Sequence, residues 1–145
     1  MNFRSTLIVA FSKFHTMVLR ITKGKLMGRL AGLDMLLLTT VGKKTGKKRY
    51  TPLLFKKIDS SYYCVGSFGG SDKAPHWYTN ILSNPSVEIL AEGKFFPAEA
   101  QVLEGKAKIE AWNSLSTLYP NFQKYQSRTK RVIPVIRFEY RPIRD

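Results

Sequence analysis

A short segment between two apolar runs concentrates cationic side chains on a turn. Residues 39–53 read TTVGKKTGKKRYTPL and carry five cations, namely Lys43, Lys44, Lys47, Lys48 and Arg49. Glycine permits positive φ and exposes backbone N–H groups, so a loop of this composition can form an anion-binding nest surrounded by ammonium and guanidinium groups. It is not a Walker A motif, because only three residues separate Gly42 from Gly46 and no Ser or Thr follows Lys47. A solvated hairpin turn whose lysines blunt a sheet edge is the alternative interpretation.

Two later segments could hold a ligand beside this loop. Residues 66–85 read GSFGGSDKAPHWYTNILSNP, where glycines precede a helix start and can offer backbone N–H groups to anionic or carbonyl oxygens. Residues 118–129 read LYPNFQKYQSRT and place the rings of Tyr119, Phe122 and Tyr125 at three-residue steps, on one side of a helix or of a series of turns. Such a row is more often core than cofactor wall, but two of its rings carry hydroxyls that need partners when buried.

The composition of the whole chain limits the chemistry open to these segments. Its 145 residues, 43% of them hydrophobic, suit one domain with one core. The chain holds 24 Lys and Arg against 10 Asp and Glu, and 11 of the cations lie in the first 50 residues. This excess suits nucleic acid, an anionic membrane surface or a polyanionic small molecule. Nucleic acid is disfavoured, since no zinc-finger spacing, RNP-like aromatic pair or basic region before heptads is present.

The few cysteines and histidines restrict the chemistry further. Cys64 is the only cysteine, which excludes an intrachain disulfide framework and fits a reducing cytoplasm. His15 and His76 are the only histidines and stand in different contexts, so neither a metal centre nor a Ser-His-Asp triad is expected. We therefore expect a bound cofactor to supply the chemistry.

Hydrophobic periodicity predicts a helix and linker followed by a small barrel. The expected units are residues 1–33, with Gly24, Gly28 and Gly32 in the linker, and residues 34–145, a six-stranded antiparallel split β-barrel with peripheral helices. Alternating apolar runs between turn signals predict strands at residues 34–41, 49–57, 61–68, 86–91, 94–104 and 132–140, and helices at 75–84 and 106–119. Three consecutive leucines at 36–38 indicate a strand covered on both faces.

The first predicted helix has an apolar stripe. Its members recur at steps of three and four, at Phe3, Leu7, Phe11, Phe14, Val18 and Ile21. The longest uncharged run, residues 5–12, is far shorter than the roughly 20 residues of a membrane span. The stripe either packs on the core of the domain or rests on anionic lipid at the inner face of the membrane.

The three segments, in this order, resemble the deazaflavin-dependent nitroreductase family, split β-barrel oxidoreductases that use coenzyme F-420. The family pattern is TTxGxKTGxxRxxPL, then S-x-GG leading to P-x-WYxNLxxNPxV, then YPxYxxYQxRTxRxIPV, and the match covers residues 37–135. The resemblance implies a split barrel with the cofactor in a groove along its surface.

The resemblance also implies roles for individual residues. The hairpin would hold the phosphodiester and oligoglutamate tail of the cofactor, mainly through Lys43, Lys44, Thr45 and Arg49. The deazaflavin ring would lie near Val65, Ser67, Gly69, His76, Trp77 and Tyr78. Tyr119, Phe122, Tyr125 and Leu54 would line the substrate side. The implied reaction is hydride transfer from C5 of the reduced deazaflavin to an activated alkene, a quinone or a nitro compound. Ser67 and Tyr125 would donate hydrogen bonds to the acceptor, and Tyr119 or Tyr125 would supply the proton.

Departures from the family pattern keep other functions open. Phe68 stands where lysine is common, and Phe122 replaces a common tyrosine. The alternatives are a split-barrel carrier of FMN, haem or a fatty acid, and a peripheral membrane module in which the barrel is only a scaffold. A monomer and a homodimer are equally compatible with the sequence.

Overall fold

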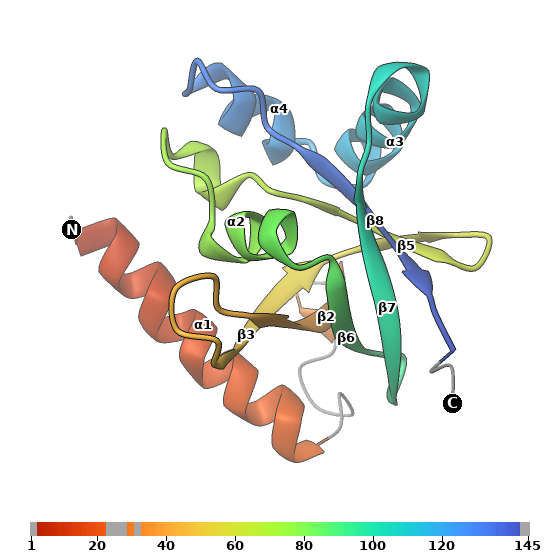
Figure 1. Cartoon of the computed structure of the whole chain (residues 1–145). Helices are drawn as coiled ribbons and strands as arrows, with labels where there is room; N and C mark the ends of the chain where they lie inside the picture. The colour runs from red at the N-terminus through yellow and green to blue at the C-terminus, as the bar shows by residue number, and fades with distance from the viewer. Residues whose placement is uncertain (1–2, 23–28, 31–32, 143–145) are drawn as a thin grey trace.

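The strands form one curled antiparallel sheet, which the computed structural model describes over residues 3–22, 29–30 and 33–142. Within these residues the sheet has the order β1-β2-β6-β7-β8-β5-β4, and β3 pairs with the other edge of β2 (Figure 1). The strand bounds are β1 Arg29–Leu30, β2 Leu33–Val41, β3 Lys48–Leu54, β4 Lys56–Ile58, β5 Ser61–Val65, β6 Ser86–Ala91, β7 Lys94–Val102 and β8 Val135–Tyr140. The curl makes a half-barrel, which agrees with the predicted split-barrel fold.

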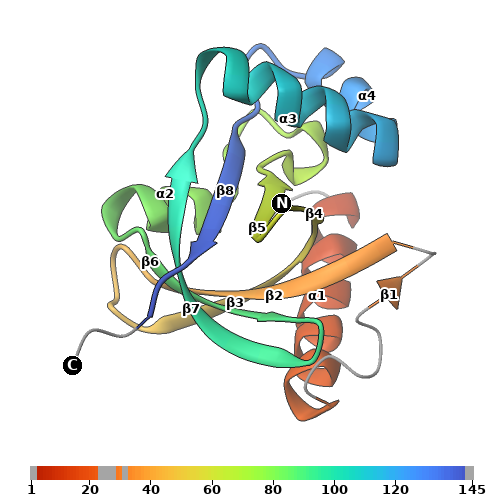
Figure 2. The same ribbon diagram turned by 90° about the vertical axis from the view of Figure 1, so that its right-hand side faces the viewer.

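Helices lie around this sheet at two ends. Their bounds are α1 Phe3–Thr22, α2 His76–Ser83, α3 Gly105–Leu118 and α4 Asn121–Ser127, with a 3-10 turn, η1, at Phe68–Gly70. Helix α1 runs along the β2–β3 hairpin, whereas α3 and α4 lie at the other end of the barrel (Figures 1 and 2). Helix α4 contacts η1. The aromatic segment at residues 118–129 therefore meets the glycine-rich turn, residues 66–71, in space.

The core explains why β2 consists of consecutive leucines. Leu36 and Leu38 are buried inside the half-barrel with Ile89 and Phe138, whereas Leu37 is buried on the opposite face with Leu90 and is packed against Tyr50. The prediction of a strand covered on both faces is therefore confirmed.

Most predicted elements are present, and the differences have local causes. The strand expected at 49–57 is divided at Phe55, which is buried and separates β3 from β4. The strand expected at 61–68 ends at Val65, because Phe68, Gly69 and Gly70 all have positive φ and form η1. The ring-bearing segment left open between helix and turns forms α4.

The apolar stripe of α1 points away from the barrel. Leu7, Phe11 and Phe14 are about half exposed, and so are Ile8 and Met17. The first interpretation of this helix, that the stripe packs on the core of the domain, is therefore wrong for these residues in the single chain. The division of the chain at residue 33 stays a prediction, and the linker glycines Gly24, Gly28 and Gly32 lie outside the described residues.

No helix in the described part of the chain is both long and apolar enough to cross a membrane.

Candidate functional site

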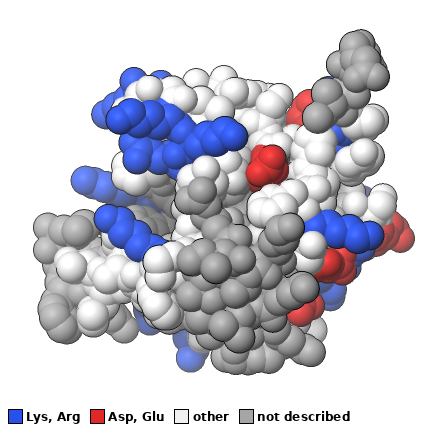
Figure 3. All heavy atoms as spheres, turned by 90° about the horizontal axis from the view of Figure 1, so that it is seen from below, with Lys and Arg blue, Asp and Glu red and all other residues white. Residues whose placement is uncertain are grey.

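A pocket of about 690 Å³ lies where α1, the loop of the β2–β3 hairpin and the start of α2 meet. Its cations are Lys13 from α1 and Lys43, Lys44, Lys48 and Arg49 from the hairpin, and none of the described residues that line it is Asp or Glu. Seen from below, the largest group of Lys and Arg side chains lies at the upper left of the molecule, whereas the Asp and Glu side chains in view lie in the middle and on the right (Figure 3). This pocket, called the basic pocket below, is suited to an anion with several charges.

Backbone bonds shape the hairpin loop at the mouth of the basic pocket. The Gly42 N–H donates to the Lys47 carbonyl at 2.7 Å, and the Gly46 N–H donates to the Gly42 carbonyl at 2.8 Å. Gly46 has φ of 69°, and a Cβ on Gly42 would stand 2.8 Å from Thr45 Oγ1, so both glycines are needed for this turn.

The Thr45 hydroxyl organises the cations of the loop. Its Oγ1 accepts from the Lys47 N–H at 3.3 Å and from the Arg49 guanidinium at 3.4 Å. Because the oxygen accepts both bonds, its own hydrogen can be donated to an anion in the basic pocket. Thr45 and Arg49 were both predicted from the sequence as cofactor-binding residues, and the structure places them side by side.

Asn80 joins α2 to the hairpin, a role that the sequence analysis did not assign. Its Oδ1 accepts from the Lys43 N–H at 3.0 Å, and its Nδ2 donates to Thr40 Oγ1 at 3.1 Å. The side chain is buried and belongs to the wall of the basic pocket. The available signal was its place in the WYxN part of the second motif, a polar residue on the inner side of a short helix.

Arg131 holds the glycine-rich turn in place, and this role was also missed. Its guanidinium donates to the carbonyls of Ser71 at 2.7 Å, Gly66 at 3.2 Å and Ser67 at 2.8 Å. Partial burial lowers the pKa of Arg131, while the charges of Asp72 and Tyr78 act in the opposite direction. A guanidinium stays protonated throughout the physiological range, so deprotonation does not break these three positioning contacts. The signal in the sequence was the second arginine of the third motif.

Gln126 supports Arg131 from α4. Its Nε2 donates to the Arg131 carbonyl at 2.8 Å, and its Oε1 accepts from the Ile133 N–H at 2.9 Å. Together, Gln126 and Arg131 connect α4, the segment that leads into β8 and the glycine-rich turn.

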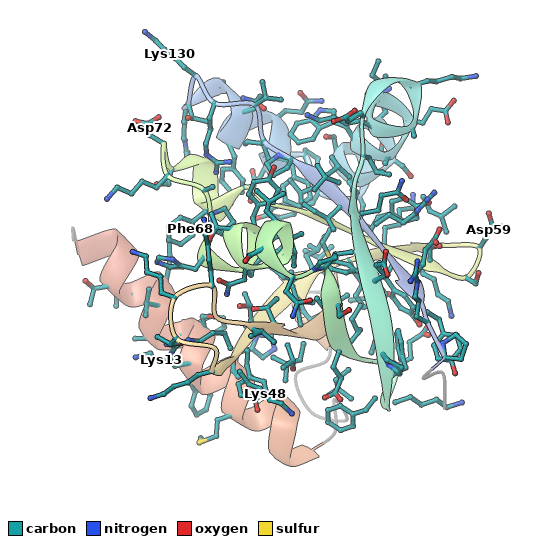
Figure 4. The ribbon with its side chains drawn as sticks, viewed as in Figure 1. Lys13, Lys48, Asp59, Phe68, Asp72 and Lys130 are labelled. Carbon is teal, nitrogen blue, oxygen red and sulfur yellow. The ribbon has the colours of Figure 1, made fainter. Side chains whose placement is uncertain are left out.

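The glycine-rich turn is pressed against α4 at one point and exposed at another. Gly70 has φ of 81°, and a Cβ there would lie 2.7 Å from the Tyr125 carbonyl oxygen, so no other residue fits. Phe68 has φ of 44° and is 37% exposed, an unusual backbone conformation for an aromatic residue. It lies on the segment between β5 and α2 (Figure 4).

The aromatic residues of the third motif form a cluster in α4 and just before it. The hydroxyls of Tyr119 and Tyr125 are 3.2 Å apart, within hydrogen-bonding distance. Phe122 is buried, 5% exposed, among Leu115 and Ile133, and Leu54 is packed against the same cluster. Phe122 therefore lies within this core and the partly buried Leu54 packs against it, and their role as a substrate wall stays a prediction.

The predicted site residues fall into two neighbouring groups. The basic pocket brings together Lys43, Lys44, Thr45, Arg49, His76 and Trp77. Ser67 and Gly69 lie in the glycine-rich turn, which α4 contacts, and Tyr119 and Tyr125 lie at or within α4. Val65 is buried at the end of β5, and Tyr78 is packed against the barrel core.

Burial also removes one group from consideration as a reactive centre. Cys64 lies wholly inside the half-barrel, and desolvation raises the pKa of its thiol far above the usual value. A thiol in this state is a poor nucleophile.

Comparison with known proteins identifies the family. A family model described as F-420H(2)-dependent quinone reductase matches residues 11–139. An F-420H(2)-dependent quinone reductase of Mycobacterium tuberculosis is 35% identical over 132 residues, covering 88% of this chain and 89% of the relative.

Two solved structures agree with this result. A reductase described as dependent on F-420-H2 is 40% identical, covers 72% of this chain and 93% of its own, and superposes with a TM-score of 0.67. A protein described as a domain-swapped dimer is 36% identical, covers 85% of this chain and 93% of its own, and has a TM-score of 0.69. The chain therefore belongs to the family of F-420H(2)-dependent quinone reductases.

Proposed function

We propose that this protein binds coenzyme F-420 and uses its reduced form to reduce a quinone. The observation that carries the proposal is the basic pocket, which gathers five cations, with no carboxylate among its described lining residues, beside the start of α2. The donor set suits phosphodiester and carboxylate oxygens, because guanidinium and ammonium groups form charge-assisted hydrogen bonds with both. The residues present therefore fit the group that the family uses.

The hairpin and α2 together would hold the tail of the cofactor. The Arg49 guanidinium and the Thr45 hydroxyl are neighbouring hydrogen-bond donors in the hairpin. Asn80 of α2 accepts the Lys43 N–H and so holds the hairpin backbone against α2. Each exposed contact contributes only about 0.5 kcal/mol, so affinity has to come from several cations acting together. His76 and Trp77 line the same pocket. They begin α2, the first helix after the glycine-rich turn, and so connect the proposed tail site with that turn.

When bound, the reduced deazaflavin supplies a hydride, and the protein has to position the acceptor and stabilise charge on its oxygen. We assign hydrogen-bond donation to Ser67 and Tyr125. The Tyr119–Tyr125 hydroxyl pair supports a proton source here, since the two phenolic oxygens lie 3.2 Å apart and either hydroxyl can be the donor. Arg131 keeps the Ser67 backbone in place by its bond to the carbonyl.

A quinone is the acceptor named for the relatives, and we propose it for this chain. Activated alkenes and nitro compounds are further acceptors for the same chemistry, because each places negative charge on oxygen or on an adjacent atom as hydride arrives.

The test is a titration of the full chain with F-420, FMN and haem, followed by quenching of tryptophan fluorescence. Saturable binding of F-420 in the micromolar range, with weaker binding of FMN and haem, is expected, together with reduction of a soluble quinone by reduced F-420. Binding of FMN or haem in preference to F-420 would instead establish the carrier function.

A matched pair of variants shows whether the hairpin acts as proposed. Lys44→Ala combined with Arg49→Ala should weaken F-420 binding about fivefold, because two cations of the basic pocket are lost. Lys106→Ala is the control, since this side chain is highly exposed on α3 and far from the basic pocket.

We also propose that α1 rests on an anionic membrane surface at the inner face of the cytoplasmic membrane. The outward position of Leu7, Phe11 and Phe14 supports this, because half-exposed apolar side chains on one helix face suit the boundary between headgroups and acyl chains. The full chain should sediment with vesicles containing anionic lipid, and a triple replacement of these residues by serine should not. Equal sedimentation of both proteins would exclude the lipid contact.

The assembly state is open to a direct test as well. The similarity to a domain-swapped dimer supports a homodimer. Light scattering with size-exclusion chromatography should give twice the mass of the chain, and a mass of one chain would show a monomer.

A further inference from the structure

We propose that α1 forms the outer wall of the binding site for the anionic tail of the cofactor, with Lys13 as its ligand-binding residue. The inference rests on the proposed use of F-420 and adds to the hairpin a second element that contacts the tail.

The orientation of α1 is the reverse of what burial of apolar surface would produce. Ser12, Lys13 and Thr16 line the basic pocket, whereas Phe11 and Phe14 are about half exposed to solvent. Residues three and four positions apart share a helix face, so the polar residues form one side of α1 and the stripe forms another. A helix that turns its polar side inward must have a polar partner on that side.

Among the described residues of the basic pocket, the hairpin provides no carboxylate partner for Lys13. Lys13 faces a pocket whose other charges are Lys43, Lys44, Lys48 and Arg49, and none of the described lining residues is acidic. Figure 4 shows Lys13 on α1 where the helix passes the hairpin, and Lys48 on the same side of the barrel. Five like charges around one pocket repel one another, and an anion with several charges placed among them removes that repulsion.

Two hydroxyl-bearing residues of α1, Ser12 and Thr16, line the basic pocket, and they differ in their hydrogen bonds. Thr16 Oγ1 donates to the Ser12 carbonyl at 2.7 Å, so its hydrogen is already used within the helix. The Ser12 side chain lines the basic pocket and has no such bond among the described residues. Lys13 and the Ser12 hydroxyl are therefore the two donors that α1 offers to the tail.

This arrangement gives the site a preference for ligands with many charges. A single phosphate can reach only part of a set of cations that spans α1, the hairpin loop and β3. An oligoglutamate tail carries carboxylates spaced along its length and can engage the loop and α1 at once. Tail binding should therefore also hold α1 against the hairpin.

Two ligands separate the tail from the ring in the test. Lys13→Ala, Lys13→Glu and the control Lys106→Ala are each titrated with F-420 and with the same deazaflavin bearing only its ribityl chain. For F-420, the dissociation constant should rise about threefold in Lys13→Ala and about tenfold or more in Lys13→Glu, because one contact is lost or reversed. For the ligand without phosphate, all four proteins including the wild type should agree.

Hydrogen exchange on the wild type gives a readout that does not depend on a variant. The amides of residues 6–17 should become more protected when F-420 binds and should not change with the ribityl compound. Unchanged F-420 affinity in Lys13→Glu, with weakened binding in the hairpin double variant, would overturn the role of α1 and leave the proposed function intact. Equal loss of both ligands in Lys13→Glu would also overturn it, while failure of the wild type to bind F-420 would remove the proposed function itself.

Discussion

The side-chain oxygen of Asn80 accepts the Lys43 backbone N–H at 3.0 Å, and so joins α2 to a hairpin loop 37 positions earlier in the chain. The same amide donates to Thr40, which is fully buried in β2. One buried side chain thus fixes the distance between the cations of the loop and the residues that begin α2. This contact explains how two motifs far apart in the sequence form one pocket.

Replacing Asn80 should therefore affect both stability and tail binding. Asn80→Ala leaves the Thr40 hydroxyl and the Lys43 N–H without this partner, which should cost about 2 kcal/mol of unfolding free energy. Urea denaturation measures that loss, and fluorescence titration should show weaker F-420 binding. Asn84→Ala is the control, since its side chain only accepts an exposed bond from Ser86 N–H. A loss of stability no larger than that of the control would contradict the assigned role.

Replacing Arg131 tests the positioning of the glycine-rich turn. Arg131→Lys keeps the charge but cannot reproduce three bonds to Gly66, Ser67 and Ser71, because an ammonium lacks the planar fork. We expect a loss of about 2 kcal/mol in unfolding free energy and at least tenfold weaker binding of the ribityl deazaflavin, with the salt dependence of F-420 binding unchanged.

Arg128→Lys is the matched variant for this experiment. Arg128 is exposed, and its guanidinium lies 5.5 Å from the centre of the Tyr125 ring. Lysine keeps both the charge and the Cβ beside Gly70, so this replacement should leave the turn in place. Equal effects of the two replacements would show that Arg131 has no special influence on the ring site.

Phe68 combines a strained backbone with a position near the expected ring site. Phe68→Gly should raise the unfolding free energy by about 1 kcal/mol, because glycine adopts φ of 44° without steric cost. Phe68→Ala removes the same ring and keeps the strain, so it should show no such gain. Thermal denaturation of the two variants separates the backbone effect from the loss of the ring.

A lysine at this position tests the departure from the family pattern. Phe68→Lys should tighten F-420 binding a few-fold at low salt, and the gain should disappear at high salt, where exposed charges are screened. A gain that persists at high salt would indicate a contact other than an ion pair.

A small hydrogen-bond network around Glu92 predicts how the stability of the fold responds to acid. Glu92 accepts from Lys57 Nζ at 3.0 Å and from the Tyr62 hydroxyl at 2.8 Å. The bond from Lys57, then that from Tyr62, lowers the pKa of Glu92 below its ordinary value of 4.5. A lowered folded-state pKa contributes stability that is present above pH 4.5 and is lost as pH falls through the folded-state value.

Glu92→Gln should therefore be less stable than the wild type at pH 6, and the difference should narrow below pH 4.5. Unfolding midpoints measured from pH 3 to 7 provide the test. Tyr62→Phe should cost about 1 kcal/mol at pH 6, because one bond to the carboxylate is lost. A constant difference between Glu92→Gln and the wild type down to pH 3 would contradict the effect on Glu92.

Local patterns in the sequence were sufficient for most of the elements. The leucines at 36–38, the alternating runs of β6 and β7, and the proline that precedes α2 each depend on neighbours within a few residues. The same holds for the cationic loop, since its glycines are required by its own turn. The break at Phe55 was not predictable in this way, because it depends on the burial of the Phe55 side chain among core residues of other strands.

The sequence by itself determined where the cations, the glycine-rich turn and the tyrosines stand along the chain. Only the tertiary structure decided that Lys13 joins the hairpin cations and that Phe122 belongs to the core. The same structure decided that Asn80 holds the hairpin and that Arg131 holds the glycine-rich turn. It also decided that the apolar stripe of α1 faces outward. Periodicity shows that a helix has two faces, but which face is covered depends on the surfaces of distant elements, and these meet only when the chain has folded.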